Sequence, residues 1–111
     1  MKNYYMCRCL SLYRCCNSIT IEEAYEMLRV NPEAILLDVR SCQEYNEEHL
    51  RRSINISVYH LNRCVEKIIP NKETTIIVYC QGDSRSEDAV NILRMKGYSN
   101  VYHICGGLNG I

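Results

Sequence analysis

From residue 18 onward, hydrophobic positions alternate between helical spacing and short apolar runs. Apolar residues recur at helical spacing from Ile21 to Leu28, from Leu61 to Ile68 and from Ala89 to Leu93. Between these segments, apolar or β-branched runs at 34–37, 53–56, 75–79 and 101–104 predict strands. Because strands alternate with helices, the pattern predicts an α/β protein with an open, mainly parallel sheet and helices on both faces.

Capping signals place the ends of several helices. Thr20-Ile21-Glu22-Glu23 and Ser41-Cys42-Gln43-Glu44 both read as capping boxes, with a hydroxyl at the N-cap and a carboxylate three residues later. The first predicted helix ends at Asn31-Pro32, and the second is a short polar helix running toward His49. A last helix is predicted from 86 to 96, with Gly97 as its C-terminal cap.

Residues 1–17 differ from the rest of the chain. They carry four of the eight cysteines (Cys7, Cys9, Cys15 and Cys16) and show no clear period. We interpret them as a Cys-rich N-terminal extension, or alternatively as a first strand, ahead of one domain at 18–111. A metal site is less favoured, since Cys-x-Cys and Cys-Cys are not the Cys-x-x-Cys knuckles of structural zinc sites.

Composition excludes several classes of partner. The 111 residues fit a single domain, and 13 basic residues balance 13 acidic ones, so no footprint for nucleic acid or an anionic membrane is visible. Arg8 and Arg14 interrupt the N-terminal segment, which lacks an apolar run of signal length, and no stretch approaches a membrane span. We therefore expect a cytoplasmic protein whose thiols are mostly reduced.

Three side chains with chemical potential follow predicted strands directly: Asp38, Cys80 and Cys105. Ligands of open parallel sheets bind at the carboxyl ends of the strands. The three residues should therefore lie along one functional edge.

The turn after the strand at 75–79 carries the strongest chemical signal. It reads Tyr79-Cys80-Gln81-Gly82-Asp83-Ser84-Arg85-Ser86. A short polar turn of this kind can direct successive N–H groups inward, and the start of the next helix adds its positive dipole end. With Arg85 beyond them, these groups favour a thiolate, or a persulfide anion, on Cys80. The alternative is a purely structural role, in which Cys80 is a small buried hydrophobic residue at the end of a strand.

The stretch from Ile19 to Ile111 resembles a rhodanese-type sulfurtransferase domain. The motifs occur in the family's order: Leu36-Leu37-Asp38-Val39-Arg40, then Glu44-Tyr45 with Glu48-His49-Leu50, the strand at 53–56, the loop from Cys80 to Ser86, Gly97-Tyr98-x-x-Val101, and Gly106-Gly107-Leu108-Asn109-Gly110. Two departures are Arg51-Arg52 after the histidine, where the family has Pro-Gly, and the acidic Asp83 inside the loop.

The resemblance implies a ping-pong transfer of sulfane sulfur. Cys80 would take sulfur from thiosulfate or a persulfide and pass it to a thiol or other nucleophile. The binding residues implied are Gln81, Gly82, Asp83, Ser84, Arg85 and Ser86, and no cofactor or metal is required. Asp83 should repel a dianion such as thiosulfate, so a small-thiol or protein persulfide is the favoured donor. Asp38 and Arg40 are expected to support the edge through hydrogen bonds or an ion pair.

Other interpretations remain open. A non-catalytic binding module could use the same edge to hold a partner protein. A phosphatase or arsenate reductase is disfavoured, because those relatives have five residues between cysteine and arginine and this chain has four. A sulfur relay could pass sulfur to the N-terminal cysteines. Candidates for a resolving thiol are Cys42, Cys64 and Cys105, of which Cys64 is expected in the core and Cys105 is preferred. For the histidines, packing or capping is expected of His49, and no partner is evident for His60 or His103.

Overall fold

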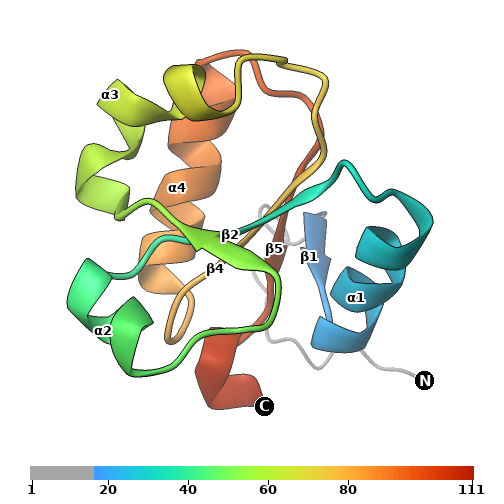
Figure 1. Cartoon of the computed structure of the whole chain (residues 1–111), viewed down its shortest axis with the longest axis vertical. Helices are drawn as coiled ribbons and strands as arrows, with labels where there is room; N and C mark the ends of the chain where they lie inside the picture. Colours follow the sequence, from blue (N-terminus) through green and yellow to red (C-terminus); the bar gives the residue numbers. More distant parts are fainter. Residues whose placement is uncertain (1–16) are drawn as a thin grey trace.

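The computed structural model describes residues 17–111, which form a five-stranded sheet in the order β1-β5-β4-β2-β3. The strands are β1 (Ser18–Ile19), β2 (Ile35–Asp38), β3 (Ser53–Asn55), β4 (Ile76–Tyr79) and β5 (Val101–Ile104). Every neighbouring pair is parallel. The predicted α/β class with an open sheet is therefore confirmed, and the sheet is parallel throughout (Figure 1).

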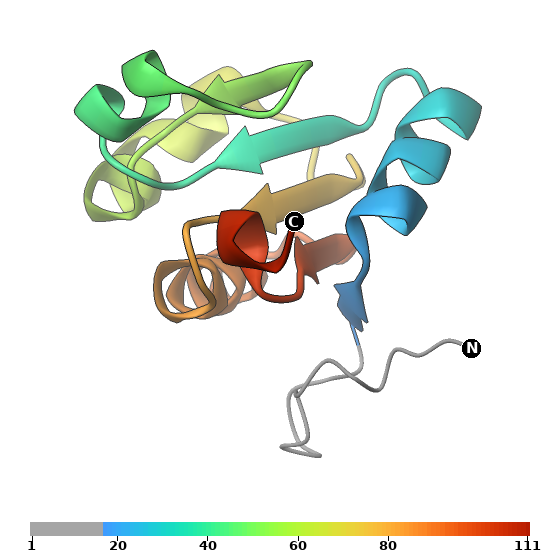
Figure 2. The same cartoon turned by 90° about the horizontal axis from the view of Figure 1, so that it is seen from below.

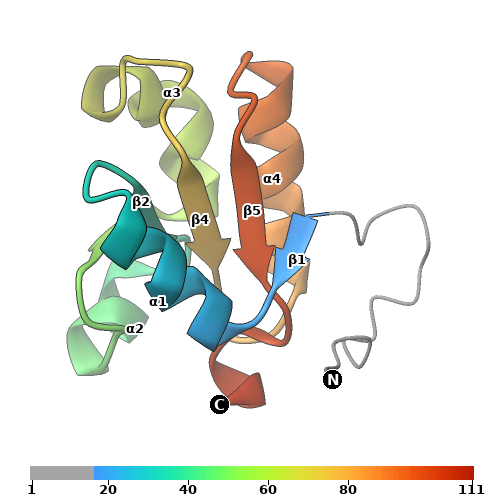
Figure 3. The ribbon, with the colours of Figure 1, turned by 90° about the vertical axis from the view of Figure 1, so that its right-hand side faces the viewer.

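Helices cover both faces of this sheet. Figure 1 shows α1 (Ile21–Val30) on one side, and α3 (Val58–Ile68) and α4 (Ser84–Met95) on the other. The short helix α2 (Cys42–Glu47) and the 3-10 turn η3 (Gly107–Gly110) lie at the end toward which β4 and β5 point (Figure 3). Within residues 17–111, none of the helices combines the length and the apolar character needed to cross a membrane.

Alternating side chains divide the core into two layers. In β4, Ile76 and Val78 pack with the buried residues of α3 and α4, whereas Ile77 and Tyr79 pack with those of α1. The same alternation assigns Leu37 to the first layer and Leu36 to the second. A strand buried on both faces needs apolar residues at every position, which explains the continuous apolar runs in the sequence. Figure 2 shows the ribbon from below, with α1 on the opposite side of the sheet from α3 and α4.

The predicted helix boundaries hold with small changes. Both capping boxes are present, with Thr20 accepting from the amide of Glu23 and Ser41 accepting from that of Glu44. Gly97 has the positive φ of +98° that suits a residue ending a helix. The last helix, α4, begins at Ser84 and not at Ser86. The loop before it is therefore shorter, and Ser86 belongs to its first turn.

Three further details differ from the sequence-based expectations. Strand β1 was not predicted, because two residues are too few to show an alternating pattern. Ile68 ends α3 with half of its surface exposed, and the next residue, Ile69, turns inward to fill the core. Cys64 is only partly buried and packs against the edge of the core. The proposed extension and its metal-site alternative lie, except for Asn17, outside the described residues.

Candidate active site

Cys80 lies where the connections of the sheet diverge. It follows β4 directly, and β4 neighbours β2 in the sheet. The chain leaving β2 proceeds to β3 on one side, and the chain leaving β4 proceeds to β5 on the other. The carboxyl ends of strands whose connections diverge in this way are the position where open α/β sheets bind ligands. As expected, two further residues lie at the same edge. Asp38 is the last residue of β2, and Cys105 directly follows β5.

The Cys80 sulfur is held by backbone groups of its own loop. The thiol is buried, with 1% of its surface exposed. Its Sγ accepts a hydrogen bond from the amide of Ser86 at 3.3 Å and donates one to the carbonyl of Gly82 at 3.3 Å. Ser86 is the third residue of α4, so its amide is among the first-turn donors that have no partner within the helix. The positive end of a 12-residue helix therefore points at the sulfur.

The C-terminal turn clamps the start of the loop through backbone contact. The amide of Leu108 donates to the carbonyl of Cys80 at 3.0 Å. A Cβ built on Gly107, whose φ is +54°, would lie 2.2 Å from the oxygen of Cys80 and 2.5 Å from that of Gly82. Only glycine permits both the backbone conformation and this close approach. The Gly106-Gly107 pair therefore allows η3 to seat directly on the loop.

Two loop side chains reach the same turn. Gln81 donates from Nε2 to Oδ1 of Asn109 at 2.8 Å, and its carbonyl accepts from the Asn109 amide at 2.9 Å. Oδ1 of Asp83 accepts from the amide of Gly106 at 2.7 Å. The acidic residue inside the loop thus has a backbone partner, and its carboxylate stays half-buried beside the cysteine loop.

Asp38 and Arg40 form a buried ion pair beside the loop. Their side chains are 0% and 3% exposed, and the shortest contact, from Nη2 to Oδ2, is 2.9 Å. Burial lowers the pKa of Arg40, but hydrogen bonds and the charge of Asp38 outweigh it and raise that pKa overall. Arg40 also donates to Oε1 of Gln81 at 3.4 Å and to the carbonyl of Glu48 at 2.7 Å. Through these contacts the ion pair connects three parts of the chain: the end of β2, the residue Glu48 that follows α2, and the cysteine loop.

Arg85 is brought onto a carboxylate from α2. Its two terminal nitrogens contact the two oxygens of Glu44 at 2.7 and 3.1 Å, with the side chains about one-third exposed. Hydrogen bonds from Arg85, followed by those from Ser41, lower the pKa of Glu44 to about 2. The sequence analysis did not include Glu44 in the site, because its residue number lies 41 positions from its partner. The carboxylate of Glu44 thus partly neutralises the positive charge of Arg85.

His103 is the buried side chain that sequence reasoning missed. It is 3% exposed, and its Nδ1 lies 3.4 Å from Oγ of Ser86 while its Nε2 lies 2.9 Å from Oγ of Ser18. Strand alternation could have placed it, since Val101 and His103 must share a face and Val101 lies in the α3–α4 layer. His49, by contrast, stacks on Tyr45 with ring centres 3.8 Å apart and stays exposed, in keeping with the packing role expected of it.

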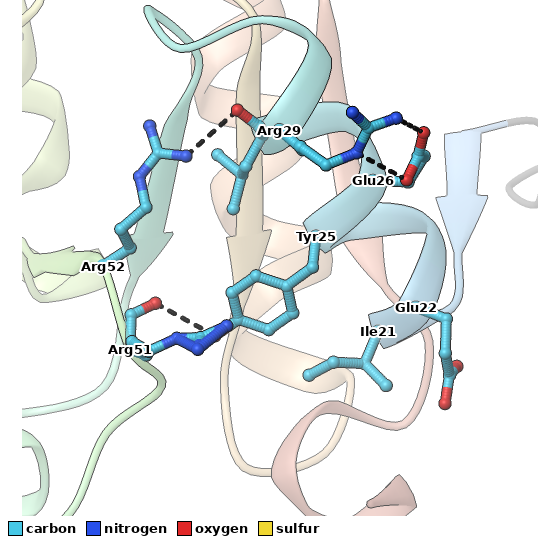
Figure 4. Close-up of a pocket in the computed structure, with 8 residues that line it drawn as sticks. Ile21, Glu22, Tyr25, Glu26, Arg29, Arg51 and Arg52 are labelled. Atoms are coloured by element: carbon cyan, nitrogen blue, oxygen red, sulfur yellow. Dashed lines mark hydrogen bonds and ion pairs between the residues drawn. The ribbon is translucent and has the colours of Figure 1, made fainter.

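A hollow lies away from this edge, along α1. It encloses about 690 Å³ and is lined by residues of α1 together with Arg51 and Arg52. Figure 4 shows the side chain of Arg51 against the ring of Tyr25, whose hydroxyl donates to the Arg51 carbonyl at 2.9 Å. None of its lining residues belongs to the cysteine loop. Among residues 17–111, no group of three or more histidine, cysteine or acidic side chains is arranged to hold a metal ion.

An open parallel α/β sheet with a cysteine held at a helix N-terminus beyond its central strand defines the class of this protein. The model of the rhodanese-like domain matches residues 20–111, and the chain belongs to this family. A thiosulfate sulfurtransferase of Escherichia coli is 35% identical over 75 residues, which are 68% of this chain and 71% of that protein. A solved structure of rhodanese with anions from E. coli has a TM-score of 0.64 and 33% identity, covering 70% of this chain and 91% of that one.

Other relatives are much longer. The tRNA uridine(34) hydroxylase of Erwinia tasmaniensis is 35% identical over 82 residues, which are 70% of this chain but 23% of that protein. The chain therefore spans about a quarter of the length of the hydroxylases it matches. A human single-domain sulfurtransferase, 22% identical with a TM-score of 0.70 over 83% of this chain and 91% of that chain, shares the fold. The family relationship is thus to sulfurtransferases and to rhodanese domains of larger enzymes.

Proposed function

We propose that this protein is a sulfurtransferase that carries sulfane sulfur as a persulfide on Cys80. The observation that carries the proposal is the hydrogen bond from the first turn of α4, at Ser86, to the buried sulfur. A helix N-terminus favours a negative charge at this point and can stabilise either a thiolate or a persulfide anion. Family membership and the sulfurtransferase relatives support this chemistry.

The reaction consists of two displacements at sulfur. In the first, the Cys80 thiolate attacks the outer sulfur of a persulfide R–S–SH, and R–S⁻ leaves with the electrons of the broken S–S bond. In the second, an acceptor thiolate attacks the outer sulfur of the Cys80 persulfide and regenerates the Cys80 thiolate. Each step forms one bond to sulfur and breaks one, so no external oxidant or reductant is needed.

We further propose that the donor is a persulfide of a small thiol or a protein, with thiosulfate a poorer substrate. Glu44 pairs with both terminal nitrogens of Arg85, which reduces the positive charge available to a dianion. The carboxylate of Asp83 adds a negative charge to the same loop. A thiosulfate dianion would meet this negative charge, whereas a singly charged or neutral persulfide would meet less repulsion.

The experiment is an intact-mass measurement of the reduced protein after exposure to each donor. The expected result is a gain of one sulfur atom that Cys80→Ser abolishes and dithiothreitol removes. Reversal by the reductant is required because two oxygen atoms have nearly the same mass as one sulfur, and a sulfinic acid is not reduced by it. Greater loading from a small-thiol persulfide than from thiosulfate is expected.

Cys105→Ser is the matched control, since Cys105 is half-buried at the same edge. Loading that survives Cys105→Ser but disappears in Cys80→Ser identifies Cys80 as the carrier. Normal loading with lost transfer to a thiol in Cys105→Ser would assign the resolving role to Cys105. If neither donor loads Cys80, the transferase proposal fails and a binding module on the rhodanese fold becomes the preferred interpretation.

A further inference from the structure

His103 is a buried imidazole that the sulfur-transfer steps do not use directly. It lies in β5 with 3% of its surface exposed, and its two ring nitrogens face the hydroxyls of Ser86 and Ser18. A polar side chain buried to this extent is retained only when its hydrogen bonds are made. Its ring therefore has a defined orientation between the first turn of α4 and strand β1.

The proton on one ring nitrogen can be assigned from Ser86. A serine hydroxyl has a single proton, and Ser86 donates its proton to the carbonyl of Asp83 at 3.1 Å. The Ser86 oxygen lies 3.4 Å from Nδ1 of His103. Both contacts are hydrogen bonds at the same time only when Nδ1 carries a proton and donates it to the Ser86 oxygen.

Through Ser86 this hydrogen bond reaches the reactive sulfur. The same residue that accepts from His103 donates its backbone amide to Cys80 Sγ at 3.3 Å. The carbonyl of Asp83, which receives the Ser86 hydroxyl, is also the acceptor for the amide of Glu87, the next residue along α4. The imidazole thus contacts the helical turn whose Ser86 N–H donates to the sulfur.

We propose that His103 is a positioning residue for Cys80, acting through Ser86 to hold the α4 amide against the thiolate. The proposal rests on the proposed function only in taking Cys80 as the nucleophile. When the Nδ1 donor is lost, the Ser86 hydroxyl loses its fixed position and the first turn can move away from the sulfur. The thiolate is then less stabilised relative to the thiol.

Three charged side chains near Cys80, those of Arg85, Arg40 and Asp83, have partners other than His103. Arg85 from α4 is paired with Glu44 from α2, and Arg40 is paired with Asp38 at the end of β2. Asp83 in the loop accepts from a backbone amide of the C-terminal turn. A substitution at His103 leaves these pairings in place, so its effect on the thiol reports on the link through Ser86.

The test is the pH profile of Cys80 alkylation by iodoacetamide in the full chain, read at the Cys80 peptide by mass spectrometry. Peptide-level readout is needed because the chain has eight cysteines. His103→Leu should slow alkylation at neutral pH about fivefold and move the midpoint of the profile upward by about 0.7 pH units. A role confined to stability would lower the unfolding midpoint without moving this profile.

His103→Asn is the conservative variant, because its amide nitrogen occupies nearly the position of Nδ1 and can donate to Ser86. Both His103 variants lose the Nε2 contact with Ser18, so the difference between them isolates the Nδ1 donor. Asn should restore most of the alkylation rate. Ser86→Ala keeps the amide but removes the hydroxyl, and should slow alkylation as His103→Leu does, with no further loss in the double variant.

His60→Asn is the matched control, since His60 is exposed on α3, and it should leave the profile unchanged. The proposal is overturned if Ser86→Ala leaves the profile at the wild-type midpoint. It is also overturned if His103→Asn and His103→Leu shift the profile equally. Because Ser86→Ala is a small change at one hydroxyl, the test can be decided even if His103→Leu does not fold. Alkylation requires no sulfur donor, so failure of the transferase proposal would be recognised separately.

Discussion

Two arginine–carboxylate pairs flank the cysteine loop, and their surroundings differ sharply. The pair of Asp38 and Arg40 is 0% and 3% exposed, whereas that of Glu44 and Arg85 is about one-third exposed. The first joins the last residue of β2 to a residue two positions further along the chain, and the second joins α2 to α4. Both contacts are short, so burial and not geometry is the main difference between them.

The difference in burial assigns the two pairs different tasks. A charge that is buried beside its partner is strongly destabilising when the partner is removed. An ion pair that water reaches contributes little to stability, but its net charge is felt by an approaching ligand. We therefore interpret the buried pair as support for the edge of the sheet and the exposed pair as a control on which donors enter.

The largest effect is expected from breaking the buried pair. Asp38→Asn keeps the side-chain shape and an oxygen acceptor but leaves the Arg40 guanidinium without its countercharge. The free energy of unfolding should fall by about 3–5 kcal/mol. Urea denaturation measures it.

The matched control is Glu26→Gln, which breaks an ion pair with Arg29 on the exposed face of α1. No measurable change is expected there, because both side chains are more than half exposed. Equal losses in the two variants would contradict the distinction drawn between buried and exposed pairs.

A smaller effect, on activity, is expected from the exposed pair. Glu44→Gln keeps the capping-box acceptor of α2 but frees the charge of Arg85. Transfer from thiosulfate should become about fivefold more efficient, while transfer from a small-thiol persulfide changes little. Steady-state kcat/KM with the two donors measures the ratio.

Glu47→Gln is the control for this prediction. It removes the same unit of charge from an exposed position of the same helix, α2. If Glu47→Gln raises the thiosulfate rate as much as Glu44→Gln does, the effect comes from net charge and not from the release of Arg85.

The smallest effect is the pH dependence of the exposed pair's stability. The pKa of Glu44 is lowered from 4.5 to about 2, chiefly by hydrogen bonds from Arg85. A lowered pKa in the folded state stabilises the protein above the ordinary pKa, and this stabilisation is lost as pH falls toward the folded value. Because the pair is partly exposed, it contributes less than about 1 kcal/mol.

The measurement is the difference in unfolding free energy between wild type and Glu44→Gln across the acid range. This difference should be constant above about pH 5, fall as the pH approaches 2, and vanish below that value, where Glu44 is protonated in the folded state as well. A difference that does not change between these limits would mean that Glu44 is not stabilised by Arg85 in solution.

Much of the fold could be predicted from the sequence because its signals are local. Thr20 and Glu23 sit three positions apart, and their capping box forms within one helical turn. The run at 75–79 gives β4 through β-branched residues that suit a strand buried on both faces. Strand β1 was missed because its two residues are held by pairing with β5, which has no local signature.

The candidate site was predicted only in part. Cys80 and its loop could be identified because a strand, a glycine turn and a helix start adjoin one another in the chain. The partners of the loop could not be identified. Arg85 finds Glu44 across 41 positions, and Ser86 meets His103 across 17. Neither pair has a spacing that local geometry enforces.

The alternation of helices and strands, the family and the position of the candidate nucleophile Cys80 could all be predicted from the sequence, since each depends on neighbouring residues. Tertiary structure decided which groups surround that cysteine. At the carboxyl ends of the strands, close packing brings together α2, α4, β5 and the C-terminal turn, which are far apart in the chain. The ion pair between Arg85 and Glu44 forms only when these elements meet, and so does the contact between the His103 imidazole and Ser86.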